Sequence, residues 1–250
     1  MNIYTKNIDR IEFVVTMSCT GRCRHCSEGE HDLRGGHIDG NIAARAVEEV
    51  CGDYNIKSLM TFGGEPLLYA DDVCMIHEAA KNAGIPRREV ITNGFFSRDE
   101  RRIAEVAERL AQSGVNRIML SVDAFHQESI PIGYVELFAK CVRNVGVFVE
   151  MHPAWLVSKE DDNPYNLRTI ELLKSFSENG FEVSEGNIIF PSGNALKYLG
   201  EYFTDQVQIN PYADDPRDIR ALCFEPDGSV LNGNINNSPI MEIIDSYIPE

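Results

Sequence analysis

Short apolar runs alternate with amphipathic stretches along most of the chain. Between the runs, apolar residues recur at three- and four-residue spacing, as at Ile103, Val106 and Leu110, which is typical of helices that pack along one face. Six β-then-α units in succession predict an α/β fold with a parallel sheet, either doubly wound or closed into a barrel. The runs that we expect to form strands are 11–15, 59–62, 89–92, 118–122, 147–151 and 188–190.

Capping and turn residues bound several of the helices. Ser97 followed three residues later by Glu100 forms a capping box, and Gly114 is expected to end that helix. Asn163, directly before a proline, predicts the start of another helix that ends by Gly180. The end signals agree with the periodicity, and both indicate regular β-α units.

The pattern weakens toward the C-terminus. Residues 196–250 contain Asn, Asp and Pro turns, with a hairpin expected around Asp227 and Gly228 and a short final helix over 240–246. We therefore expect a main domain, 1–195, and a small C-terminal extension, 196–250, that caps it.

Chemically distinctive residues follow the first five expected strands. Parallel α/β folds place their sites at these C-terminal strand ends. By location alone, His126, His152 and Trp155 become candidates for contact with a substrate. In chain order the segments are 19–26, 63–66, 93–94, 121–126 and 152–155.

Composition and charge exclude some classes of partner. The 250 residues are 43% hydrophobic and 25% charged, which is ordinary for a globular protein. A net charge of -16 argues against nucleic acid, because such binding relies on Lys and Arg that neutralise phosphates. The first ten residues lack the apolar centre of a signal peptide, and no run approaches the about 18 apolar residues of a membrane span. We expect a cytoplasmic protein without a nucleic-acid or membrane partner.

Three cysteines stand at C-x3-C-x2-C spacing directly after the first expected strand: Cys19, Cys23 and Cys26. Cysteine thiolates are the usual ligands of 4Fe-4S clusters, and an electron-transfer cluster normally takes four of them. Three thiolates leave one iron open for chemistry.

A zinc site is the alternative for these cysteines, because four Cys or His ligands can close a tetrahedron around zinc. His25, His31 or His37 could supply the fourth ligand. Zinc fingers and ribbons usually bring a second ligand pair a dozen or more residues away, and no such pair follows. The spacing therefore favours an iron-sulfur cluster.

The cysteine motif, Gly63-Gly64-Glu65-Pro66 after the second strand and Thr92-Asn93-Gly94 after the third together resemble the radical S-adenosylmethionine (SAM) superfamily. The resemblance covers about residues 10–195 in element order. It implies a partial, six-stranded TIM-like barrel, and one 4Fe-4S cluster on Cys19, Cys23 and Cys26. It also implies that SAM completes the coordination of the fourth iron.

The resemblance assigns cofactor contacts to the Gly-Gly-Glu-Pro segment. Gly63 and Gly64 lack a Cβ, which lets the backbone approach a ligand closely. Glu65 would accept hydrogen bonds from the SAM ammonium, and charge-assisted contacts of this kind are strong. An ordinary βα turn ending at Pro66 is the alternative.

Four further residues occupy positions that contact cofactor or substrate in this family. His25 lies where the family most often has an aromatic residue near the adenine, and imidazole keeps a flat face there. Asn93, Ser121 and Asp123 stand where members contact the ribose, the adenine or the substrate. Each of these three could equally be an Asn turn or a satisfied polar strand end.

The implied chemistry begins with one electron from the reduced cluster, supplied by a reductant such as flavodoxin or ferredoxin under anaerobic conditions. SAM is cleaved to methionine and a 5'-deoxyadenosyl radical, which removes a hydrogen atom from an unactivated C-H bond. The cofactors carry this chemistry, while the protein supplies orientation and a dry cavity.

The tail around 223–244 resembles the start of a SPASM or twitch extension, in which cysteines bind auxiliary clusters in many peptide-modifying members. Only Cys223 is present here, so we expect no auxiliary cluster. Cys223 could instead donate a hydrogen atom to a substrate radical, or be a packed thiol. Cys51, Cys74 and Cys141 lie in helical patterns beside apolar neighbours and are expected to be packing residues.

The tail favours a peptide or amino-acid-like substrate. Only ten residues precede the first expected strand, which leaves no room for an N-terminal peptide-recognition domain, so a non-peptide small molecule is the second hypothesis. A zinc-binding or iron-sulfur electron-transfer module without SAM chemistry is the third.

Overall fold

A seven-stranded sheet organises the computed structural model, which describes residues 2–31, 35–203 and 214–249. All neighbouring strands pair in parallel, in the order β7-β5-β4-β3-β2-β1-β9. The expected α/β class and parallel sheet are therefore confirmed. The strands are β1 (Arg10–Val14), β2 (Ser58–Phe62), β3 (Arg87–Thr92), β4 (Arg117–Ser121), β5 (Phe148–His152), β7 (Glu182–Val183) and β9 (Ala221–Phe224).

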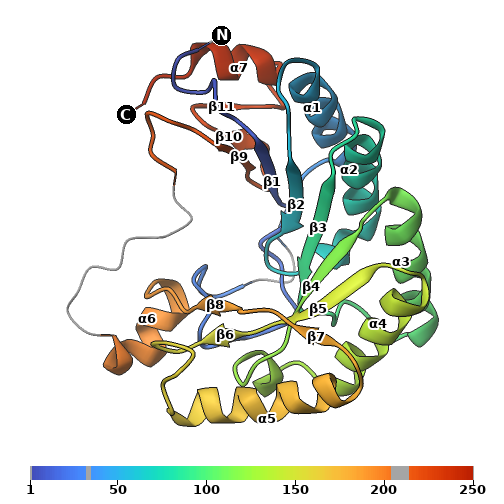
Figure 1. Cartoon of the computed structure of the whole chain (residues 1–250). Coiled ribbons are helices and arrows are strands. Elements are labelled where there is room, and N and C mark those ends of the chain that lie inside the picture. The colour runs from blue at the N-terminus through green and yellow to red at the C-terminus, as the bar shows by residue number, and fades with distance from the viewer. Residues whose placement is uncertain (1, 32–34, 204–213, 250) are drawn as a thin grey trace.

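Helices cover the convex side of this curved sheet, and the opposite side is open (Figure 1). Two further two-stranded ladders lie outside the sheet, β6 (Ala154–Trp155) with β8 (Asn187–Ile188) and β10 (Ser229–Val230) with β11 (Gly233–Asn234). The helices are α1 (Gly40–Asp53), α2 (Ala70–Asn82), α3 (Glu100–Ser113), α4 (Ile132–Asn144), α5 (Pro164–Glu178), α6 (Gly193–Leu199) and α7 (Ile240–Ser246).

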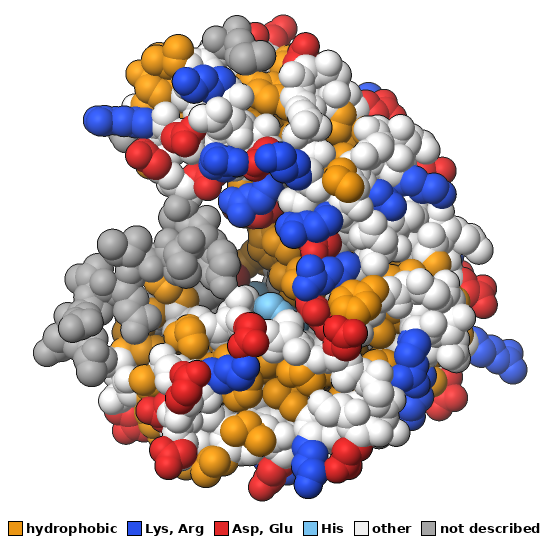
Figure 2. All heavy atoms as spheres, viewed as in Figure 1, with side chains coloured by type: hydrophobic (Ala, Val, Ile, Leu, Met, Phe, Trp, Pro, Cys, Tyr) orange, Lys and Arg blue, Asp and Glu red, His pale blue; other side chains and the backbone are white. Residues whose placement is uncertain are grey.

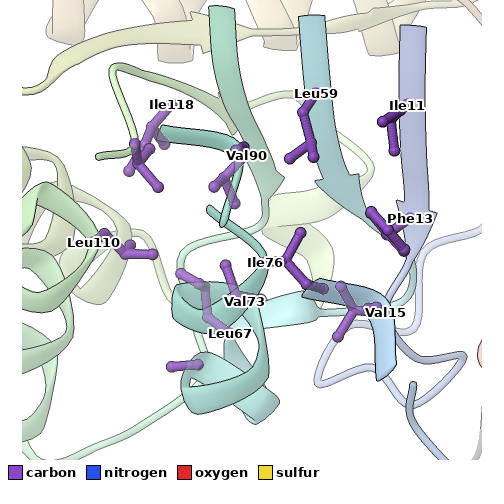
Figure 3. Packing of buried hydrophobic residues seen from close by; sticks show 14 of the residues in the cluster. Ile11, Phe13, Val15, Leu59, Leu67, Val73, Ile76, Val90, Leu110 and Ile118 are labelled. Carbon is purple, nitrogen blue, oxygen red and sulfur yellow. The ribbon is translucent and has the colours of Figure 1, made fainter. Parts of the chain in front are cut away.

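The hydrophobic core lies between the sheet and the helices. Alternate residues of each strand point to opposite faces, so one set of strand side chains meets the helices. Figure 3 shows this set packed against helix side chains such as Val73, Ile76 and Leu110. Its central members have no exposed surface: Ile11, Leu59, Val90 and Ile118.

The other set of strand side chains faces the concave side. Because the strands are in register, these side chains form rows that run across the sheet, and each row is called a level here. Six residues of one such level are aligned in register across six strands, and three of them are charged: Cys223, Glu12, Met60, Glu89, Arg117 and Phe148. Closer to the C-terminal strand ends lie Phe62, Ile91 and Met119, which are half-buried. Figure 2 shows a hollow on this side, with histidine inside it and Lys and Arg side chains along one wall.

The strand expected at 188–190 does not belong to the main sheet, contrary to the prediction. Asn187–Ile188 pairs with β6 outside the main sheet, and the position next to β5 belongs to β7. β7 consists of two exposed residues, Glu182 and Val183, and so short a segment shows no period-two pattern in the sequence.

The C-terminal extension contributes a strand to the main sheet, which the sequence pattern did not predict. β9 pairs in parallel with β1, and Phe13 stacks on Phe224 with ring centroids 4.5 Å apart. The final helix is confirmed as α7. The boundary between 195 and 196 stays a prediction, and residues 204–213 of the extension lie outside the described residues.

One local prediction needs correction. Asp99, not Ser97, is the N-cap of α3, because its carboxylate lies one residue before the helix and accepts the N–H of Arg101. The chain does turn around Asp227 and Gly228, where the Gly228 N–H donates to the Glu225 carbonyl over 2.9 Å and the Glu225 N–H donates to the Ser229 carbonyl over 2.8 Å. A second turn, at residues 231–232, joins β10 to β11. The helix ends at Gly114 and the N-cap Asn163 are confirmed.

Candidate active site

The three cysteines lie on the loop that follows β1, at the C-terminal end of the sheet. The Gly21 N–H lies 3.3 Å from Sγ of Cys19, and a Cβ on Gly21 would stand 3.2 Å from Sγ of Cys23. Two of the thiols therefore flank one glycine. Sγ of Cys26 lies 3.1 Å from Nε2 of His31.

Burial makes these thiols poor acids in the metal-free protein. It raises the pKa of Cys19 to about 12, and the charges of Glu65 and Cys26 add to the effect. Burial also raises the pKa of Cys23 and Cys26. Metal binding deprotonates thiols, and three thiols on one loop fit the donor chemistry of an iron-sulfur cluster.

The two glycines after β2 are needed by the chain's own backbone. A Cβ on Gly63 would lie 2.4 Å from the carbonyl oxygen of Thr16, and one on Gly64 would lie 2.3 Å from that of Ser18. The N–H groups of Gly64 and Glu65 donate to these same carbonyls over 2.7 and 2.8 Å. Gly63 and Gly64 therefore allow a close approach to the segment that enters the cysteine loop, and the expected approach to a ligand stays a prediction.

Glu65 is fully buried and bridges two strand ends. Its Oε1 accepts the N–H of Leu67 over 3.0 Å and the hydroxyl of Thr92 over 2.7 Å, while Oε2 accepts the N–H of Asn93 over 2.8 Å. Burial raises the pKa of Glu65 to about 7 despite these donors. Pro66, next in the chain, is buried and opens a 3-10 turn, Pro66–Tyr69.

Asn93 connects this network to the cysteine loop. Its side-chain amide lies 3.5 Å from Sγ of Cys19 and donates to the Thr20 hydroxyl over 3.2 Å. Its Oδ1 accepts the N–H of Phe95 over 2.8 Å. Three sequence segments that are far apart in the chain therefore meet at one place.

Asp123 is a satisfied polar strand end, one of the two readings left open by the sequence. Its carboxylate accepts the N–H groups of Phe125, His126 and Ala154 over 2.9–3.1 Å, and Oδ2 lies 2.7 Å from Nδ1 of His126. Burial alone would raise the pKa of Asp123, but its contacts with His126 lower it overall. Asp123 therefore orients the His126 ring.

His25 lies beside His126, with ring centroids 4.7 Å apart. Burial lowers the pKa of His25 to about 4, and its Nδ1 has no hydrogen-bond partner among the described residues. Donor atoms of Cys23, His25 and His126 all lie within 4.8 Å of one another. Among the histidines weighed as zinc ligands, His25 and His31 thus lie near a thiol, whereas His37 stacks on Tyr69 and pairs with Asp72.

Ser121 and His152 are partners in register at the ends of β4 and β5. Nδ1 of His152 lies 2.8 Å from the Ser184 hydroxyl, and its Nε2 is buried without a hydrogen-bond partner in the described part of the chain. Trp155 is 3% exposed and its indole donates to the Glu185 carbonyl, so it acts as a packing residue.

Cys223 lies on β9, in register with Glu12, and is exposed. The other three cysteines outside the motif lie on helices of the convex side and pack beside the core, as expected: Cys51, Cys74 and Cys141.

A charged ladder inside the barrel was missed by the sequence reasoning. Arg117 donates to Oε1 of Glu89 over 3.1 Å and to Oε1 of Glu150 over 2.7 Å, and both glutamates are 5% exposed. The signal available in the sequence was a charged residue at the start of, just before, or within each of three expected strands.

The radical SAM superfamily model matches residues 13–205. This chain belongs to the radical SAM superfamily. The protein is therefore an enzyme, and the family implies a 4Fe-4S cluster and SAM as its cofactors. The number of clusters and the SPASM-like tail stay predictions. In the described part of this radical SAM protein, no helix is both long and apolar enough to cross a membrane.

Curated relatives of this radical SAM enzyme include GTP 3',8-cyclases. The protein from Desulforamulus reducens is 27% identical over 158 residues, which cover 61% of this chain and 47% of that protein. A probable GTP 3',8-cyclase from Methanocaldococcus jannaschii is 26% identical over 125 residues, covering 50% and 40%. The chain thus spans about half the length of these relatives.

Solved structures confirm the partial barrel of the superfamily. Native anSMEcpe with bound AdoMet superposes with a TM-score of 0.60 at 16% identity, covering 95% of this chain and 80% of that one. SuiB of Streptococcus suis bound to precursor peptide SuiA gives 0.63 at 13% identity, covering 96% and 65%. At these identities the likeness concerns the fold alone.

Proposed function

We propose that this radical SAM enzyme acts on a non-peptide small molecule, using a 4Fe-4S cluster held by Cys19, Cys23 and Cys26. Its relatives named GTP 3',8-cyclase support a small-molecule substrate. A peptide or amino-acid-like substrate rests on the SPASM-like tail alone and is the less supported hypothesis.

The observation that carries the cofactor part of this proposal is the contact chain from Glu65 through Asn93 to Cys19. Asn93 donates its N–H to Glu65 and places its amide beside the Cys19 sulfur. The segments after β1, β2 and β3 therefore form one site at the C-terminal edge of the sheet. Parallel α/β folds bind their ligands at this edge.

When bound, the reduced cluster and SAM supply a 5'-deoxyadenosyl radical that removes a hydrogen atom from the substrate. We assign Glu65 to the SAM ammonium, since among the described residues its Oε2 accepts one hydrogen bond, from the Asn93 N–H, and keeps a lone pair free for another donor. His25 offers its ring face to the adenine. Asn93 and Ser121 remain cofactor or substrate contacts in this proposal.

The concave side supports a small substrate with both apolar and polar parts. Phe62, Ile91 and Met119 are half-buried near the strand ends, where an apolar lining keeps water from a radical. Farther from the cysteines, Arg117 lies between Glu89 and Glu150, and part of its side chain is exposed. These groups can orient a polar substituent.

Anaerobic reconstitution with iron and sulfide, followed by reduction in the presence of SAM, tests the proposal. We expect a 4Fe-4S absorption spectrum and 5'-deoxyadenosine, with dithionite or with a flavodoxin or ferredoxin as reductant. Absence of 5'-deoxyadenosine would exclude SAM chemistry, and zinc retained without iron-sulfur absorption would favour a zinc module.

A substrate panel separates the two substrate hypotheses. The panel contains GTP, other nucleotides, free amino acids and short peptides, each added to the reduced enzyme with SAM. We expect a small molecule, and no peptide, to increase 5'-deoxyadenosine formation and to yield a product detected by mass spectrometry. Stimulation by peptides alone would reverse the preference.

A further inference from the structure

Asn194, at the start of α6, holds the loop that carries the second and third cysteines. Its side-chain amide donates to the carbonyl of Cys23 over 3.2 Å and to that of Gly29 over 3.0 Å. Its backbone N–H donates to the carbonyl of Cys26 over 2.9 Å. Asn194 is only 8% exposed, so water competes little for these bonds.

The two residues before Asn194 press against the same loop. The hydroxyl of Ser192 donates to the carbonyl of Ser27 over 2.7 Å. Gly193 has a φ of 51°, and a Cβ there would lie 2.2 Å from that carbonyl oxygen and 2.6 Å from the N of Gly29. This approach between backbones excludes any side chain at position 193.

Among the described residues, few backbone hydrogen bonds form within the loop itself. Within it, the N–H of Cys26 donates to the Cys23 carbonyl over 3.3 Å, and that of Gly29 donates to the Cys26 carbonyl over 3.4 Å. Both are long for N–H···O bonds. Shorter hydrogen bonds to the loop come from Ser192 and Asn194, residues more than 160 positions away in the chain.

We propose that Asn194 is a positioning residue of the cluster site, which holds Cys23 and Cys26 in the arrangement that the 4Fe-4S cluster needs. The assignment rests on the proposed function, in which these cysteines are cluster ligands. Because a peptide unit is planar, fixing a carbonyl also fixes the direction of the next N–H. Hydrogen bonds near cluster sulfurs and the orientation of the ligands tune the potential of such sites.

Asn194→Asp is the decisive variant, because it keeps the shape of the side chain and replaces the amide donors with a carboxylate facing two carbonyl oxygens. Asn194→Ala removes the donors without adding charge. Lys197→Ala is the matched control, since Lys197 lies on the same helix and its ammonium makes exposed contacts, an ion pair with Glu30 and a cation–π contact with Tyr198.

Two measurements follow the loop and the cluster separately. In the metal-free protein, hydrogen exchange of the loop amides should accelerate in Asn194→Asp, while exchange in β2 and β3 stays unchanged. After reconstitution, iron retained against a chelator should fall in the order wild type, Asn194→Ala, Asn194→Asp. The midpoint potential of the remaining cluster should shift in both variants, and Lys197→Ala should match wild type throughout.

Each contrary result has a distinct meaning. If Asn194→Asp equals wild type in exchange and iron retention, the amide acts only as a space filler and the assignment is wrong. Faster exchange with unchanged iron retention and potential would make Asn194 a loop brace without influence on the cluster, which also overturns the assignment. A wild-type protein that assembles no 4Fe-4S cluster would overturn the proposed function itself.

Discussion

Asn93 donates its backbone N–H to Oε2 of Glu65 over 2.8 Å, and this bond joins the end of β3 to the turn after β2. Both residues are buried, and the Asn93 side chain continues to the cysteine loop. The carboxylate of Glu65 thus supports the site as a structural acceptor in addition to the role that we propose for it toward SAM.

Glu65→Gln should weaken both functions of this carboxylate. In either orientation the amide NH2 faces at least one buried donor, which leaves that donor unsatisfied at a cost of about 1–3 kcal/mol. Loss of the negative charge should lower SAM affinity roughly tenfold, or about 1.4 kcal/mol. Urea unfolding of the metal-free protein and equilibrium binding of SAM to the reconstituted protein measure the two effects.

Glu78→Gln provides the control for this prediction, because Glu78 is an exposed glutamate on α2. It should change neither quantity. Unaltered SAM binding in Glu65→Gln would remove Glu65 from the proposed ammonium contact.

Replacement of any one motif cysteine by alanine should abolish the 4Fe-4S spectrum and 5'-deoxyadenosine formation. A 4Fe-4S cluster left with two protein thiolates lacks the ligand set that we propose from Cys19, Cys23 and Cys26. Cys141→Ala is the matched control, since Cys141 lies on the outer helix α4. Full iron content in a motif variant, measured by metal analysis, would contradict the ligand assignment.

Cys223→Ala tests the hydrogen-atom donor hypothesis. A donor acts after SAM has been cleaved, so formation of 5'-deoxyadenosine should persist while substrate conversion falls roughly tenfold or more, about 1.4 kcal/mol in barrier. Cys74→Ala, on α2, serves for comparison. Equal product yield from Cys223→Ala and wild type would leave Cys223 as an ordinary strand residue.

His77 makes the stability of the fold depend on pH. It is fully buried on α2, with Nε2 3.0 Å from the Thr61 hydroxyl, and burial lowers its pKa to about 3. Its unfolded pKa is about 6.5, so the unfolded chain binds the extra proton between these values. The stability that the protein gains from keeping His77 neutral is present in full above about pH 6.5, and it is lost as the pH falls toward 3.

His77→Gln should flatten this dependence, because glutamine does not titrate. The loss of unfolding free energy that His77 causes between about pH 6.5 and pH 3 is on the order of a few kcal/mol, and it should be absent from the variant. Urea midpoints of the metal-free protein between pH 4 and pH 7 would measure it. Parallel curves for the variant and wild type would show that His77 contributes nothing to the acid sensitivity.

The sequence pattern located the central strands well, because they are buried on one face by apolar residues at period two. The sequence pattern did not predict β7 and β9, and each omission has a physical reason. β7 is two exposed residues long, and β9 lies in a segment rich in turn residues whose pairing with β1 spans about 210 positions of the chain. Contacts of that kind leave no local periodicity.

In the candidate site, too, some residues could be predicted from the sequence and others could not. Residue types and spacing singled out Cys19, Glu65 and Asn93, because unusual side chains followed strands that were themselves predictable. Arg117 and Asn194 went unnoticed, since their importance lies in which distant groups they meet.

By itself, the sequence determined the α/β class, the positions of the cysteine and Gly-Gly-Glu-Pro motifs, and membership of a superfamily that uses SAM. Only the tertiary structure decided that Gly63 and Gly64 pack against carbonyl groups of the chain itself. It also decided that the Asp123 carboxylate orients His126 and that Asn194 donates hydrogen bonds to the cysteine loop. Local residue patterns encode elements and donor types. Which groups become hydrogen-bond partners depends on how strands and loops from distant parts of the chain pack together.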